Sequence, residues 1–124
     1  MKYRHQYHAG NFADVHKHIV LLEVLAALKR KEKGFLYVDT HAGRGDYDIH
    51  PGDTEHPAEW QAGVAKLLAA QPRHAALIRY REIVAAGVHG GSLRYPGSPL
   101  LAALELRHTD RAVFFETQRD EAGH

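Results

Sequence analysis

Two predicted strand ends in this chain carry residues that could bind a nucleoside. The apolar segment 35–45 runs into a turn with Gly43 and Gly45, and the apolar segment 111–117 carries Glu116 near its end. Glycine lets backbone N–H groups approach a ligand closely, and a carboxylate can accept hydrogen bonds from ribose hydroxyls. Such groups at the carboxyl end of a sheet are typical of ligand sites in α/β proteins. An ordinary strand-to-loop turn, in which glycine serves only the backbone, is the alternative.

The separation of these two groups argues against a common cofactor fold. In the usual dinucleotide fingerprint the ribose-binding acid lies ~20 residues beyond the glycines. Here Gly45 and Glu116 lie much further apart, and two predicted helices fill the interval. We therefore expect an insertion between the first strand and its crossover helix, and an ordinary Rossmann dehydrogenase is disfavoured.

Histidines near the amino terminus and after the first strand form a second group of candidates: His5, His8, His16, His18 and His41. A metal site needs imidazoles that converge on one point, usually with a carboxylate. His16 and His18 lie two positions apart on a predicted helix, so they point about 200° apart. We predict no metal site. Lys17 and His18, near the start of that helix, could instead meet an anionic ligand group or an RNA phosphate.

The amino-terminal arm interleaves aromatic and basic side chains, namely Tyr3, Arg4, His5 and Tyr7. This pattern suits stacking on unpaired bases together with phosphate contacts, although a solvated terminus would show it as well. The basic residues among 29–33 complement the carboxyl end of a helix, and we expect them to be solvated.

Composition bounds the class of protein. A chain of 124 residues with 44% hydrophobic residues has room for one domain with a core. The absence of cysteine excludes disulfides, and a net charge of +1 provides no global basic field. No apolar run approaches the ~20 residues that cross a bilayer. We expect a soluble, cytoplasmic protein with no membrane partner.

Caps, breakers and periodicity predict the elements that position these residues. Asn11 is the predicted N-cap of the first helix, and Gly34 is its predicted stop. Ser98 is the predicted N-cap of a helix that ends near Arg107. The other expected features are strands at 35–39 and 111–117, turns at 46–56, helices from Pro57 and over 73–86, and a loop at 87–91.

Three strings in the sequence match one known family. They are Tyr3-Arg-His-Gln-Tyr-His-Ala-Gly-Asn-Phe-Ala-Asp-Val-His-Lys-His18, Phe35-Leu-Tyr-Val-Asp-Thr-His-Ala-Gly43 and Tyr95-Pro-Gly-Ser-Pro99. They closely resemble the bacterial enzymes that use S-adenosylmethionine to methylate N6 of an adenine in large-subunit ribosomal RNA. The likeness runs through all 124 residues in order.

The resemblance implies a fold and a set of site residues. It implies an α/β fold that is part of a class I (Rossmann-like) methyltransferase, with a helical insertion after the first strand and with later strands absent from this chain. Glu116 would hold the ribose hydroxyls of S-adenosylmethionine, and Tyr3 and His5 would approach the RNA. The other residues expected to border the cofactor are Lys17, His18, His41, Gly43 and Ser98.

We expect one methyltransferase domain in four segments. They are the arm and first helix (1–34), the first strand and glycine turn (35–45), the helical insertion (46–92), and the crossover helix with the second strand (93–124). Two strands with exposed edges would also favour self-association.

The sequence departs from the family in one respect. Family members carry an Asp-Pro-Pro-Tyr tetrapeptide after a later strand, which orients the adenine amino group and stacks on the flipped base. This sequence contains no such tetrapeptide. We therefore expect no catalytic residue in this chain and negligible methyl transfer by it alone. A non-catalytic RNA- or nucleotide-binding module is the alternative function.

Overall fold

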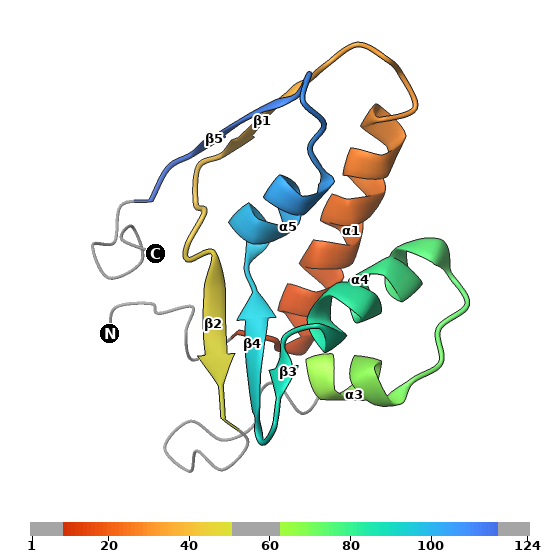
Figure 1. Cartoon of the computed structure of the whole chain (residues 1–124), viewed down its shortest axis with the longest axis vertical. Helices are drawn as coiled ribbons and strands as arrows, with labels where there is room; N and C mark the ends of the chain where they lie inside the picture. Colours follow the sequence, from red (N-terminus) through yellow and green to blue (C-terminus); the bar gives the residue numbers. More distant parts are fainter. Residues whose placement is uncertain (1–8, 51–62, 117–124) are drawn as a thin grey trace.

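The computed structural model describes residues 9–50 and 63–116. In that part of the chain, helices α1, α3, α4 and α5 pack beside two small sheets (Figure 1). The architecture is therefore mixed α/β, as predicted. The predictions for Tyr3 and His5, and for a helix that starts at Pro57, lie outside the described residues.

Strands β1 (Leu36–Asp39) and β5 (Arg111–Phe114) form a parallel pair. Their first residues lie opposite each other, and so do their last residues. Helix α5 (Ser98–Glu105) precedes β5 and packs against it (Figure 1). The prediction of strands at 35–39 and 111–117 is thus confirmed to within three residues at each end.

Helix α1 (Phe12–Leu28) begins where the sequence predicts but ends earlier. The Asn11 side chain caps it by accepting a hydrogen bond from the backbone N–H of Asp14 at 2.8 Å. The prediction that the helix continues to Gly34 is wrong, because residues 29–33 follow the helix rather than form its last turn.

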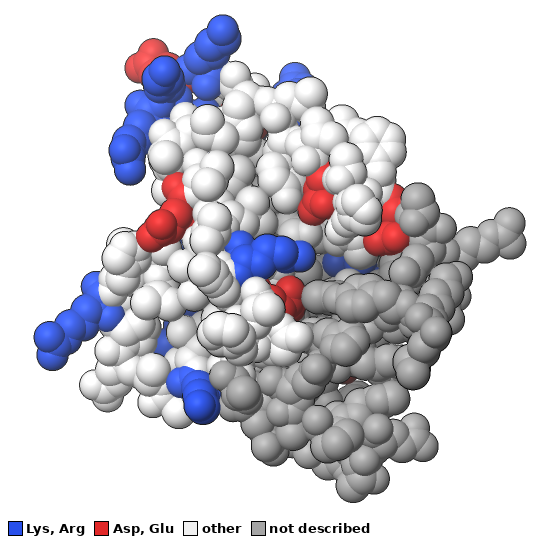
Figure 2. Space-filling view, turned by 180° about the vertical axis from the view of Figure 1, so that it is seen from behind, with Lys and Arg blue, Asp and Glu red and all other residues white. Residues whose placement is uncertain are grey.

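Arg107 holds the loop that follows α1. Its guanidinium donates hydrogen bonds to the backbone carbonyls of Lys29, Lys31 and Lys33. The carboxylate of Asp110 accepts from the same guanidinium at 3.0 and 3.2 Å, and these hydrogen bonds lower the pKa of Asp110. Positive side chains gather at the upper corner of the molecule where this loop lies (Figure 2). The loop is ordered by partners distant in sequence, which no local pattern reveals.

Strands β2 (Asp46–Ile49), β4 (Ser92–Pro96) and β3 (Val88–His89) form an antiparallel sheet in the order β2–β4–β3. This sheet corrects two predictions. The sequence suggests turns at 46–56 and a loop at 87–91, whereas both segments contribute strand residues.

Alternating burial explains the antiparallel sheet. Tyr47 and Ile49 are buried in β2, Leu93 and Tyr95 are buried in β4, and the residues between them are exposed. A period of two is the signature of a strand with one buried face. The segment 46–92 is therefore not purely helical, since it holds strands as well as helices.

Helices α3 (Val64–Ala69) and α4 (Ala75–Ala85) complete the core. The ring of His74 caps α4 by accepting a hydrogen bond from the backbone N–H of Ala76 at 3.2 Å. Helix α4 packs against α1, α3 and β4. The face of α4 that meets the core consists of Leu77, Tyr80, Ile83 and Val84.

The β1–β5 pair keeps apolar side chains exposed. Leu36 and Val38 in β1 are 61% and 48% exposed, and Phe115, directly after β5, is 54% exposed. Val24 and Leu28 on α1 are 50% and 44% exposed. The described residues therefore cover these surfaces incompletely. None of the described helices is long and apolar enough to cross a membrane.

Candidate functional site

The turn after β1 contacts the carboxyl end of β5. The backbone N–H of Gly43 donates to Oε2 of Glu116 at 2.7 Å, and the N–H of Ala42 donates to the carbonyl of Phe115 at 3.0 Å. Gly43 has a φ of 68°, in the left-handed region that glycine adopts without strain. The structure thus brings together the two groups that the sequence singles out.

Asp39, the last residue of β1, organises this edge of the sheet. Its Oδ2 accepts hydrogen bonds from the hydroxyls of Ser98 at 2.7 Å and Tyr37 at 3.2 Å, and its Oδ1 accepts from the N–H of His41 at 3.0 Å. Burial, followed by the charge of Asp39, raises the pKa of Tyr37 to about 12, so this hydroxyl remains a donor at neutral pH. One carboxylate therefore ties α5 to the turn.

Ser98 and His41 lie beside the turn in different environments. Ser98 is buried at the first position of α5, and Gly97 rather than Ser98 is the N-cap. The Ser98 hydroxyl also lies 3.4 Å from the carbonyl of Ala42. His41 is exposed, with Nδ1 3.0 Å from the hydroxyl of Thr40. Ser98 holds the edge together, and His41 is accessible at its surface.

His18 belongs to a buried polar cluster. Its Nδ1 lies 3.0 Å from the Tyr80 hydroxyl and 2.9 Å from the Tyr95 hydroxyl, and the two hydroxyls lie 2.6 Å apart. Its Nε2 lies 3.6 Å from Oδ1 of Asp14. Burial raises the pKa of both tyrosines, which keeps their hydroxyls neutral. Lys17 is instead exposed, so Lys17 and His18, which the sequence places together near the start of the helix, lie in different environments.

Sequence reasoning missed Asp14, Tyr47, Tyr80 and Tyr95 as polar partners in this region. The spacing of four between Asp14 and His18 places both on one face of a helix and could have revealed that contact. The tyrosines come from other elements and leave no local signal. Tyr95 lies opposite Tyr47 in the β2–β4 ladder, so the buried cluster adjoins the strand next to the turn.

The described histidines do not gather around one point. His16 is exposed and His18 is buried, which confirms that they face different sides of α1. Among residues 9–50 and 63–116, no three His, Asp or Glu side chains form a group that could hold a metal ion. His5 and His8 lie outside these ranges.

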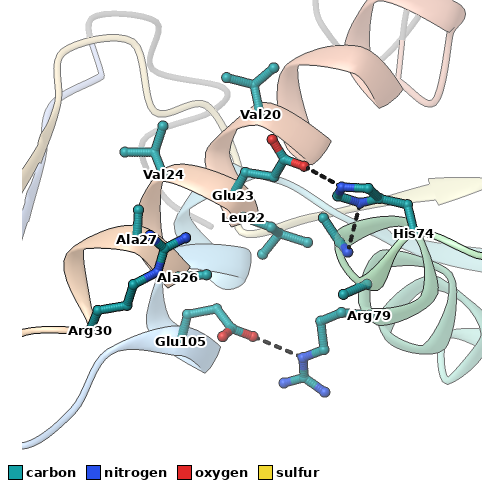
Figure 3. Close-up of a pocket in the computed structure, with 12 residues that line it drawn as sticks. Val20, Leu22, Glu23, Val24, Ala26, Ala27, Arg30, His74, Arg79 and Glu105 are labelled. Atoms are coloured by element: carbon teal, nitrogen blue, oxygen red, sulfur yellow. Dashed lines mark hydrogen bonds and ion pairs between the residues drawn. The ribbon is translucent and has the colours of Figure 1, made fainter.

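A separate pocket of about 650 Å³ lies between α1, α4 and α5 (Figure 3). Val24 contributes apolar surface, Nε2 of His74 lies 3.1 Å from the Glu23 carboxylate, and Nε of Arg79 lies 2.9 Å from the Glu105 carboxylate. None of its described lining residues belongs to the turn after β1 or to the end of β5. The pocket is therefore distinct from the predicted nucleoside site.

Comparison with known proteins links this geometry to a family. A family model described as "Ribosomal RNA large subunit methyltransferase D, RlmJ" matches residues 32–123. Two curated relatives are both named "Ribosomal RNA large subunit methyltransferase J". The Haemophilus influenzae protein is 44% identical over 118 residues, which cover 94% of this chain and 42% of the relative. The Escherichia coli protein is 44% identical over 111 residues, which cover 89% of this chain and 40% of that relative.

A solved structure agrees with the sequence comparison. The crystal structure of protein LPL1258 from Legionella pneumophila matches with a TM-score of 0.75 and 34% identity, over 92% of this chain and 42% of that chain. The chain thus spans about two fifths of the length of these relatives. Because the family model includes β1, the glycine turn, α5 and Glu116, this chain belongs to the RlmJ family of ribosomal RNA large subunit methyltransferases.

Proposed function

We propose that this chain supplies the S-adenosylmethionine-binding part of an enzyme that methylates N6 of an adenine in large-subunit ribosomal RNA. The observation that carries the proposal is the 2.7 Å hydrogen bond from Gly43 to Glu116, which joins two strand ends at one edge. The names of the curated relatives support a ribosomal RNA substrate.

We further propose that β1 and β5 belong to a class I, Rossmann-like sheet. Their parallel pairing, with α5 as the crossover helix, supports this assignment. The antiparallel sheet and helices α3 and α4 would then be an insertion between β1 and α5, because they lie between these two elements in the chain.

Glu116 is the proposed ribose ligand. Its carboxylate lies at the glycine turn, where Oε2 accepts the hydrogen bond from Gly43. A carboxylate at this edge can accept hydrogen bonds from two adjacent ribose hydroxyls. The glycine turn lets an adenosyl group approach the backbone, and the exposed His41 is proposed to border the same ligand.

The remaining proposed contacts are less direct. Ser98 supports the turn through its buried hydroxyl, and His18 supports the neighbouring strand through the buried cluster. Lys17 is exposed and could meet an anionic group of the donor or the RNA. Tyr3 and His5, outside the described residues, are proposed to contact the RNA.

The chemistry of the proposed reaction requires orientation above all. S-adenosylmethionine, when bound, supplies an electrophilic methyl group for in-line attack by the adenine nitrogen. Fixed placement of two reactants accounts for a large part of many enzymatic accelerations. The residues of this chain would bind and orient the adenosyl group. Their proposed role is binding, since the chain contains no Asp-Pro-Pro-Tyr tetrapeptide.

A chimera tests this proposal. The aligned segment of the Haemophilus influenzae relative is replaced by this chain, and the product is assayed with labelled S-adenosylmethionine and deproteinised large-subunit RNA. We expect N6-methyladenosine in the digested RNA. Glu116→Ala in the chimera is expected to weaken donor binding at least about 10-fold, because hydrogen bonds to a charged group are lost. A folded chimera that binds the donor but never methylates RNA would favour the non-catalytic alternative.

We also propose that the chain self-associates through the β1–β5 pair. Each of these strands has one edge with no described strand beside it, and Leu36, Val38 and Phe115 are exposed nearby. Unpaired strand edges promote pairing with another chain. Sedimentation velocity of the 124-residue chain at micromolar concentration should show dimers or larger species. A monomer would contradict this proposal.

A further inference from the structure

Tyr47 lies directly beneath the turn that follows β1. Its hydroxyl accepts a hydrogen bond from the backbone N–H of Arg44 at 3.0 Å. The same oxygen lies 2.6 Å from the position that a Cβ on Gly43 would occupy. The Cε2 atom of the Tyr47 ring lies 3.2 Å from the position that a Cβ on Gly97 would occupy. Tyr47 is only 2% exposed. Its ring therefore fills the space between the turn and the start of α5.

The turn is held from three sides. The N–H of Gly43 donates to the end of β5, and the carbonyl of Gly45 accepts from the N–H of Gly97 at 2.9 Å. The N–H of Arg44 donates to Tyr47. Of these three contacts, the last alone comes from a strand of the antiparallel sheet, so it couples that sheet to the candidate site.

The ring of Tyr47 is itself fixed by the core. It lies opposite Tyr95 in the β2–β4 ladder, and the Tyr95 hydroxyl belongs to the buried cluster with His18 and Tyr80. The guanidinium of Arg44 lies over the ring, 5.9 Å from its centroid, within the range of a cation–π contact. The hydroxyl is therefore held at one position under the turn.

From these contacts we propose that Tyr47 is a positioning residue, which holds the turn in the conformation that binds the adenosyl group. This inference rests on the proposed function of the turn. A backbone that is ordered before binding loses less conformational freedom when the ligand arrives, and this raises affinity. Tyr47 acts through the backbone of Arg44 and Gly43, without contact to the ligand.

The variant Tyr47→Phe removes the hydroxyl and keeps the ring. Val84→Ala is the matched control, because it weakens the buried core on α4 without touching the turn. Each 15N-labelled chain is titrated with S-adenosylmethionine while its amide resonances are followed by NMR. Amide hydrogen exchange is measured before ligand is added.

We expect Tyr47→Phe to raise the Kd for S-adenosylmethionine about 5- to 10-fold, the value of one hydrogen bond. The Arg44 amide should exchange faster in this variant, relative to the amides of α4. Val84→Ala should lower the Tm but leave the Kd and the relative exchange of Arg44 unchanged.

The outcomes separate this inference from the proposed function. If the natural chain binds the donor and Tyr47→Phe binds it within about twofold, the inference is wrong and the proposed function stands. If Val84→Ala weakens binding as much as Tyr47→Phe does, general destabilisation explains both, and the inference is again wrong. A natural chain that does not bind the donor overturns the function and the inference together.

Discussion

Replacement of Gly43 by alanine is expected to weaken S-adenosylmethionine binding at least about 10-fold and to destabilise the fold by about 2–4 kcal/mol. The φ of 68° at Gly43 is unfavourable for a residue that has a Cβ. The added Cβ would lie 2.6 Å from the Tyr47 hydroxyl, so the turn or the tyrosine must move. Movement of the turn disturbs the hydrogen bond from Gly43 to Glu116, and movement of the tyrosine disturbs the hydrogen bond from Arg44 to its hydroxyl. NMR titration measures the affinity, and urea unfolding measures the free energy of unfolding.

Gly90→Ala is the matched control for this variant. Gly90 has a φ of 58°, but no atom lies within 4 Å of an added Cβ, and it lies in the turn between β3 and β4. Gly90→Ala should lower the free energy of unfolding by about 1–2 kcal/mol and leave the affinity for S-adenosylmethionine unchanged. Equal affinities for Gly43→Ala and Gly90→Ala would show that the glycine turn does not bind the donor.

His18→Ala is expected to lower the free energy of unfolding by about 3 kcal/mol at pH 7. The ring is completely buried and lies within hydrogen-bonding distance of the hydroxyls of Tyr80 and Tyr95. Its removal opens a cavity and deprives two buried hydroxyls of a partner. Urea unfolding followed by circular dichroism measures the effect.

The same change on the other side of α1 provides the control. His16 is exposed two positions away, and His16→Ala should change the free energy of unfolding by less than about 0.5 kcal/mol. If the two variants were equally stable, the buried cluster would not contribute to the fold as the geometry requires.

Elements with strong local signals could be predicted from the sequence. Asn11 caps α1 as expected, and the apolar residues of β1 and β5 give strands at their predicted places. The antiparallel sheet was not predictable in the same way. Asp46 and Asp48 are frequent in turns, yet here they point outward from β2 while Tyr47 and Ile49 face the core. Whether this segment forms a turn or a strand depends on its pairing with β4, which lies far along the chain.

In the candidate site, too, the sequence predicts some contacts and does not reveal others. The approach of Gly43 to Glu116 follows from a general rule, because parallel strands bring their carboxyl ends to one edge. The role of Ser98 as a hydrogen-bond donor to Asp39 depends on how α5 docks, and no spacing reveals it. The burial of His18 likewise depends on tyrosines from α4 and β4.

In the proposed function, the glycine turn and the end of β5 bind one adenosyl group. Titration of S-adenosylmethionine into the 15N-labelled chain, followed by NMR, tests it most directly. We expect the largest amide shifts at Gly43, Arg44 and Glu116, which adjoin one another in the structure. Shifts confined to the pocket between α1 and α4, for example at Val24 and His74, would contradict it.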